Sequence, residues 1–169
     1  MLLILLSNLI VTSFLVGLIW FVQVVHYPIF QKVGKQEFHH FHTFHTLQTG
    51  KIVILPMLLE LGLSILLVWE GHGIDYMLST DNISENMAMR MGNFYSYSFI
   101  ALSLTISLWI LTAWIFVPLH GKLGNEKTGY DKEKMKKLVR RNWFRTILWS
   151  FRLLFLIYMM IETTNNIYM

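Results

Sequence analysis

Histidines gather in one short stretch of the chain, where four of them fall within the seven residues from 39 to 45. The stretch reads "EFHHFHTFH", and its spacing places His39, His42 and His45 along one side of a helix. Neutral imidazole is a common ligand of zinc, copper, iron and haem iron. Two interpretations are open at this point: a set of ligands, or a hydrated interfacial helix that carries neutral histidines.

Two further histidines lie beside prolines at the ends of apolar runs. His26, in "QVVHYPIF", comes two positions before Pro28, and His120, in "FVPLHGKL", comes two positions after Pro118. Proline frees backbone carbonyls and bends helices, which is tolerated at membrane depth only where protein or a hydrated cavity compensates. The candidate metal ligands are therefore His26, His42, His45 and His120, and the candidate cofactor-binding or proton-relaying residues are His26, His45 and His120.

Two charged residues interrupt long apolar tracts at similar depth. Glu60 lies nine residues beyond Lys51, and Arg152 lies eleven beyond Arg141. These separations place them about 13 Å and about 16 Å along their helices. An ionised residue near the middle of a bilayer costs at least about 2.5 to 3.5 kcal/mol unless it is paired or hydrated, so we expect Glu60 and Arg152 to pair. The pair either holds the bundle together or sets the charge of a substrate cavity.

Polar residues also form a stripe on the last apolar segment. Asn142, Arg145, Trp149 and Arg152 recur at helical spacing, which predicts that they face the bundle interior. Arg145 is close enough to the membrane surface to serve instead as a phosphate-level anchor. His45 and Glu60 are fifteen residues apart, about 22 Å on one helix, so we expect a histidine layer and a separate charged layer. The candidate catalytic residues are Glu60, Arg152, Arg145 and Tyr27.

The elements that must position these side chains follow from the distribution of charge. The chain has 169 residues, of which 54% are hydrophobic and only 14% are charged, well below the roughly one quarter typical of soluble domains. Four tracts with few or no charges are long enough to span a bilayer. We predict an all-α, integral membrane four-helix bundle in a single domain, with helices at about 3–27, 50–70, 93–117 and 142–162.

The charges of the connecting segments predict an orientation. Segment 26–51 carries three lysines and one glutamate, segment 70–90 one arginine and four acidic residues, and segment 118–141 eight basic and three acidic residues. The positive-inside rule then makes loops 28–49 and 118–141 cytoplasmic, with both termini outside and an up-down-up-down topology. A short amphipathic helix is expected to begin near Asp131, and His72 is expected in an exposed loop on the other side.

The motifs "WFVQVVHYPIF", "LPMLLELG", "VPLHGKL" and "LVRRNWFRTILWSFR" together resemble an uncharacterised family of small four-helix bacterial membrane proteins. More distantly, the chain is similar to anthrone-oxygenase-like proteins and to four-helix haem-associated protoporphyrinogen-oxidase and copper-resistance membrane proteins. The haem-associated pattern has its histidine near the start of the first helix, whereas His26 lies at the end. The resemblance to the first family implies a multi-pass protein of the bacterial inner (cytoplasmic) membrane, with functional residues at His26, Tyr27, Pro28, His45, Glu60, His120, Asn142, Trp143, Arg145, Trp149 and Arg152.

Two classes of function fit these residues. The first is a membrane oxidoreductase or oxygenase that acts on a lipophilic substrate with haem, iron or copper. The second is a non-enzymatic module that binds or transports a small amphipathic or anionic molecule. The chain has no cysteine, which excludes disulfides and thiolate metal sites. Its net charge of +4 sits where topology requires it, so the expected partners are the lipid bilayer and a lipophilic ligand, with no nucleic acid.

Overall fold

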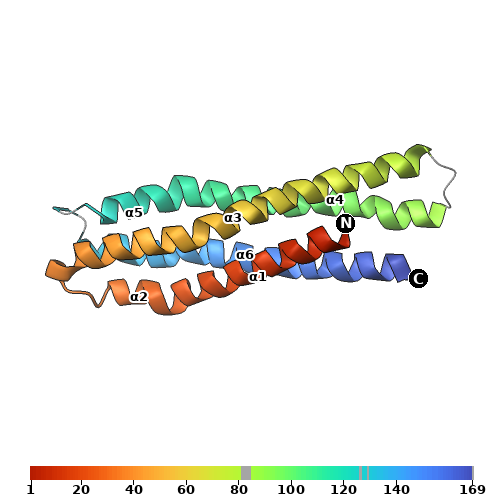
Figure 1. Ribbon diagram of the computed structural model, residues 1–169. Helices are drawn as coiled ribbons and strands as arrows, with labels where there is room; N and C mark the ends of the chain where they lie inside the picture. The colour runs from red at the N-terminus through yellow and green to blue at the C-terminus, as the bar shows by residue number, and fades with distance from the viewer. Residues whose placement is uncertain (81–84, 126, 129, 169) are drawn as a thin grey trace.

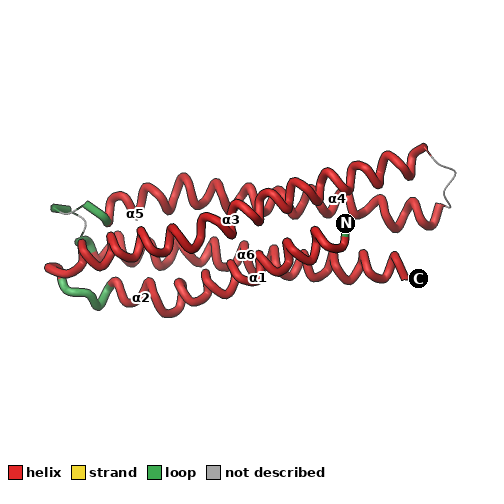
Figure 2. The backbone as a smooth tube through the Cα atoms, viewed as in Figure 1, coloured by secondary structure: helices red, strands yellow, loops and turns green. Residues whose placement is uncertain are grey.

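The computed structural model is almost entirely helical in the part of the chain that it describes, apart from short turns that Figure 2 shows in green. It describes residues 1–169 except 81–84, 126, 129 and 169, and it gives no side chains for 77–92 and 166–168. The elements are α1 (Leu2–Phe21), η1 (Val22–His26), α2 (Tyr27–Phe30), α3 (Lys35–Thr80), α4 (Glu85–Leu111), η2 (Thr112–Phe116), α5 (Val117–Leu123) and α6 (Lys132–Tyr168).

Four helical segments among the described residues are long and apolar enough to cross a membrane, as the composition predicts. They are Leu2–Phe30, Lys35–Tyr76, Asn93–Leu123 and Lys132–Asn165. Each contains one predicted helix and extends beyond it. The largest difference is at α3, which starts at Lys35 and turns most of the expected loop 28–49 into helix. Hydropathy marks only the apolar middle of a helix, whereas helical hydrogen bonding continues wherever the ends find packing partners.

The helices form one bundle in which α1 packs against α3 and α6, and α4 packs against the same two helices (Figure 1). One end of the bundle holds α2, the start of α3, α5 and the start of α6, and we call it the histidine end (Figure 1). Both chain termini lie toward the opposite end (Figure 1). His72, expected in a loop, lies instead within α3, where its ring contacts Tyr95 at 5.7 Å between centroids.

A single π-helical turn precedes each of the two prolines at the histidine end. In η1 the N–H of Tyr27 donates to the carbonyl of Val22, and in η2 the N–H of Val117 donates to the carbonyl of Thr112. The next residue in each case is a proline, Pro28 or Pro118, which has no N–H to donate. The wider turns let both helices continue through proline, so the predicted bends take the form of π-turns.

Helix α6 begins where the sequence predicts a helix near Asp131. The Asp131 carboxylate accepts hydrogen bonds from the N–H groups of Glu133 at 2.9 Å and Lys134 at 3.1 Å. The backbone N–H of Lys134 is the largest cause that holds the pKa of this exposed carboxyl below its usual value. Asp131 is therefore the N-cap that fixes the start of α6.

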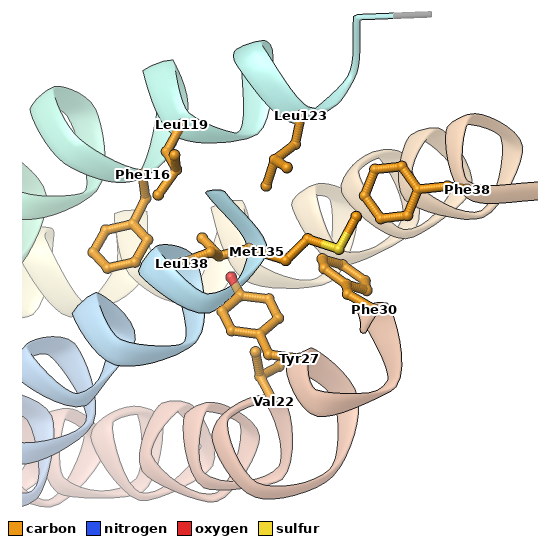
Figure 3. Packing of buried hydrophobic residues seen from close by; sticks show 9 residues of the cluster. All are labelled: Val22, Tyr27, Phe30, Phe38, Phe116, Leu119, Leu123, Met135 and Leu138. Atoms are coloured by element: carbon orange, nitrogen blue, oxygen red, sulfur yellow. The ribbon is translucent and has the colours of Figure 1, made fainter. Parts of the chain in front are cut away.

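Apolar side chains at the histidine end pack the helix ends together. Figure 3 shows the cluster, with Tyr27 pointing from α2 into it and Met135 and Leu138 entering from α6. Its members are Val22, Tyr27, Phe30, Phe38, Phe116, Leu119, Leu123, Met135 and Leu138. Met135 and Leu138 are fully buried, as expected for the apolar face of an amphipathic helix. This packing fixes the backbone from which the histidines extend.

Candidate functional site

The four candidate histidine ligands lie close together, brought in from three segments of chain. His26 ends η1, His42 and His45 lie one turn apart on α3, and His120 lies on α5. The rings of His26 and His45 stack with centroids 4.2 Å apart, and the rings of His45 and His120 are 5.9 Å apart. His40 is exposed, and His39 is only partly buried. The helical spacing predicted that His39, His42 and His45 share one face, and of these His42 and His45 are buried.

Two of these histidines, His42 and His120, form a hydrogen-bonded chain with Tyr27. His42 Nε2 lies 3.1 Å from His120 Nδ1, and His120 Nε2 lies 3.0 Å from the Tyr27 hydroxyl. A neutral imidazole has one donor and one acceptor nitrogen, so the chain can be polarised in either direction. His42 Nδ1 has no hydrogen-bond partner in the part of the chain that the structure describes. A proton that arrives at this atom and one that leaves from Tyr27 would convert one arrangement into the other. The chain is thus suited to acid–base chemistry.

A cavity of about 700 Å³ borders this chain, in the size range of small-molecule sites. It lies between α3 on one side and η2 and α5 on the other. Its lining includes Tyr27, His42, His45, His120 and Arg145 as polar groups, with Thr43, Thr46, Leu47, Thr49, Gly50, Val53, Thr112, Phe116, Val117, Gly121 and Gly124. Leu47 and Val117 are 55% and 62% exposed on the outer surface of the bundle. The cavity therefore opens sideways, between two helices of membrane-spanning length.

Arg145 lies at the inner wall of this cavity and is buried, with 7% of its surface exposed. Its guanidinium carbon stands 4.5 Å above the centre of the Phe116 ring and 5.1 Å from that of Trp149. Such cation–π contacts are worth about 2 kcal/mol when desolvated. Arg145 also interacts with Tyr27, at the end of the hydrogen-bonded chain. Its buried position is inconsistent with the anchor interpretation and agrees with the interior-facing stripe.

Glu60 and Arg152 form the predicted ion pair, with Arg152 Nη1 2.9 Å from Glu60 Oε1 and both side chains fully buried. The arginine also donates from Nε to Thr105 Oγ1 at 2.8 Å, and from Nη2 to Asn8 Oδ1 and Ser64 Oγ at 2.8 Å each. A further hydrogen bond joins Nη1 to the Thr12 hydroxyl. All five guanidinium donors therefore have partners, contributed by α1, α3 and α4.

The glutamate is satisfied as well. Thr12 donates to Glu60 Oε1 at 2.8 Å, and the indole N–H of Trp149 donates to Oε2 at 3.2 Å. Neither Glu60 nor Arg152 lines the 700 Å³ cavity or the smaller 40 Å³ pocket beneath it, which extends from Tyr27 to Trp149. This arrangement favours a structural role for the pair, which joins all four long helices through one polar network.

The predicted site residues therefore divide into two layers, as expected. His26, Tyr27, His42, His45, His120 and Arg145 come together at the histidine end, whereas Glu60 and Arg152 lie deeper in the bundle. His26 contributes through its stacked ring and does not line the cavity. Within the described part of the chain, no three histidine, aspartate or glutamate side chains are arranged to hold a metal ion. These residues do not fit a preformed metal centre with three protein ligands.

Sequence reasoning did not select the uncharged partners of the charged residues. Asn8, Thr12, Ser64 and Thr105 are fully buried and complete the Glu60–Arg152 network. Asn142, which was selected, donates to a residue that was not, Gln23, at 2.9 Å. The available signal was the four-residue spacing of Asn8 and Thr12 inside an apolar tract, which places both on one helical face.

The structure is thus a bundle of helices long enough to span a membrane, with a cavity that opens at its side and has polar groups at its inner wall. Comparison with protein-family models, with curated protein sequences and with solved structures finds no match to this chain. The family resemblance drawn from the motifs consequently stays a prediction, and the function must be argued from the site itself.

Proposed function

We propose that this protein binds a lipophilic molecule with a polar head in the 700 Å³ cavity, and that the molecule enters from the bilayer. The observation that carries the proposal is the composition of the cavity: its mouth is flanked by exposed apolar side chains, and its inner wall holds imidazoles, a phenol and a guanidinium. Ligand sites combine a mostly apolar lining with a few placed polar groups in this way. The apolar part of the ligand lies toward the mouth and its head lies at Tyr27, His120 and Arg145.

The proposed setting is the bacterial inner membrane, with an up-down-up-down bundle, both termini outside and the histidine end toward the cytoplasm. The positive charges of segments 26–51 and 118–141 support this orientation. Because the chain has no cysteine, one cysteine introduced at Asn125 reports a single position. A membrane-impermeant maleimide should label it only after spheroplasts are permeabilised. Labelling in intact spheroplasts would contradict this orientation and place the histidine end outside.

Cysteine protection tests where the ligand binds. Thr46 lines the cavity, whereas Gln48, two residues further along α3, is exposed and does not. Lauryl alcohol at saturating concentration should slow the reaction of Thr46→Cys with a membrane-permeant maleimide and leave the reaction of Gln48→Cys unchanged. Equal effects on the two variants, or none on either, would refute binding in the cavity.

The second candidate is an oxidoreductase or oxygenase that acts on such a molecule. The hydrogen-bonded chain of His42, His120 and Tyr27 favours it, because the chain ends at the cavity and can carry a proton to or from a bound head group. Haem, iron or copper held by His26, His45 or His120 would supply the redox chemistry, although the described side chains do not form a three-ligand metal site.

Optical spectra and elemental analysis of the purified protein test this candidate. A haem or metal enzyme should show a Soret band or stoichiometric metal that His26→Ala and His120→Ala remove. A colourless, metal-free preparation would exclude this candidate. Cofactor content in both variants equal to that of the wild type would exclude His26 and His120 as ligands. Either result would favour the binding function.

A further inference from the structure

Arg145 is a buried cation without a described counter-ion. It forms no ion pair with any carboxylate in the part of the chain whose side chains are described, unlike Arg152, which is paired with Glu60. Its side-chain oxygen neighbours are the Tyr27 hydroxyl and Asn142 Oδ1, and the latter lies 3.5 Å from Nη1, at the limit of a hydrogen bond. Its Nε is buried and has no hydrogen-bond partner among the described residues. Burial of a charge with neither an opposite charge nor a full set of hydrogen bonds is costly.

Arg152, the other buried arginine of α6, shows that the fold can satisfy a buried guanidinium. Arg152 uses all five donors and an anionic partner within protein, seven residues along the same helix. Arg145 contacts the rings of Phe116 and Trp149 and lines the cavity. A guanidinium without a carboxylate partner among the described side chains therefore lines the place where a ligand head would lie.

We infer that the ligand is an acid, whose carboxylate pairs with Arg145 and lies within reach of the Tyr27 hydroxyl. A guanidinium binds a carboxylate through two parallel hydrogen bonds, and the single negative charge balances the single positive one. This inference rests on the proposed function, since it names the head group of the molecule bound in the same cavity.

A matched pair of probes tests the inference. Lauric acid and lauryl alcohol share an apolar chain and differ in the head group, so the ratio of their dissociation constants isolates the contribution of the charge. Isothermal titration calorimetry of the detergent-solubilised protein, at a pH where the acid is ionised, should give lauric acid an affinity roughly ten- to a hundredfold higher, as charge-assisted hydrogen bonds provide.

The variant Arg145→Gln should lose the preference for the acid and bind lauric acid no better than the alcohol. Arg140→Gln is the matched control, because Arg140 is exposed on the same helix and does not line the cavity. It removes the same charge and should keep the preference for the acid.

The outcomes separate the two levels of the argument. Failure of the wild type to bind either probe would overturn the proposed function. Binding of both probes with equal affinity, or an unchanged preference in Arg145→Gln, would overturn the carboxylate assignment alone. If Arg145→Gln loses both probes, Arg145→Lys decides: a retained preference for the acid supports the assignment, and equal affinities refute it.

Discussion

At the scale of single residues, the two arginines of α6 illustrate two uses of a buried charge. Arg152 is enclosed by partners from protein and joins the helices, whereas Arg145 has no carboxylate partner among the described side chains and lines a cavity. Their spacing of seven residues places both on the inner face of one helix, so the difference comes from what the neighbouring helices present. Asn8, Thr12, Ser64 and Thr105 supply oxygen atoms around Arg152, and Phe116 supplies an aromatic ring above Arg145.

The paired network predicts a large stability effect at Glu60. Glu60→Gln leaves the Arg152 guanidinium buried without its negative partner, and we expect the free energy of unfolding to fall by about 3–5 kcal/mol. Glu70→Gln is the control on the same helix, because Glu70 pairs with the N-terminal amine at 3.1 Å in a partly exposed position, and its replacement should cost only about 0–1 kcal/mol. Denaturant unfolding in detergent measures both. Equal stabilities of the two variants would contradict the structural role of the buried pair.

The pairing of Glu60 with Arg152 was predictable from the sequence because charged residues in an apolar tract demand compensation at the same depth. The hydroxyl and amide partners were not, since Ser and Thr also satisfy their own hydroxyls on the helix backbone. Ser98 and Ser103 do so, donating to carbonyls four residues earlier at 2.8 Å. A single sequence does not separate these from Ser64 and Thr105, which additionally contact Arg152.

At the scale of elements, the helices were predictable and their ends were not. A helix that crosses a bilayer needs an apolar middle, and hydropathy detects this middle in the sequence. Four such helices were expected, and four are present among the described residues. The early start of α3 at Lys35 depends on tertiary packing, since Phe38 is buried against α2 and α6. Periodicity did predict that His42 and His45 lie on one face. The prolines predicted bends near Pro28 and Pro118, but not that these would take the form of π-turns.

A close approach between α3 and α4 gives a test of the packing of the elements. A Cβ atom added at Gly71 would lie 2.9 Å from the Cα atom of Tyr95, so Gly71→Ala must push the two helices apart. We expect a loss of about 1–3 kcal/mol in stability. Gly73→Ala is the matched control, since nothing lies within 4 Å of an added Cβ there, and alanine should be neutral or stabilise the helix by up to about 1 kcal/mol.

Thermal unfolding of the two variants in the same detergent makes this comparison. A Gly71→Ala variant as stable as Gly73→Ala would show that α3 and α4 are not packed this closely at Gly71. The pair also separates the steric effect from the general gain that alanine brings to a helix, because both substitutions change the same chain by one methyl group.

At the scale of the whole molecule, the cavity is a product of assembly. Its wall combines residues of α2, α3, η2, α5 and α6, so it exists only when all four long helices have packed. The sequence indicated that histidines and an arginine share one end of the bundle, yet the open space between α3 and α5 depends on side-chain packing that no local pattern encodes. Small residues on both sides of it, Gly50, Gly121 and Gly124, contribute to that space.

The most direct test of a ligand site in this cavity uses a substitution that fills the space without disturbing the fold. Gly50 lines the cavity and Gly62 faces outward on the same helix, and an added Cβ would meet nothing within 4 Å at either position. Titration of lauric acid into Gly50→Leu and Gly62→Leu, with equal thermal stabilities as the control for folding, compares the two. We predict that Gly50→Leu abolishes binding and Gly62→Leu binds like the wild type. Undiminished binding by Gly50→Leu would contradict a ligand site in this cavity.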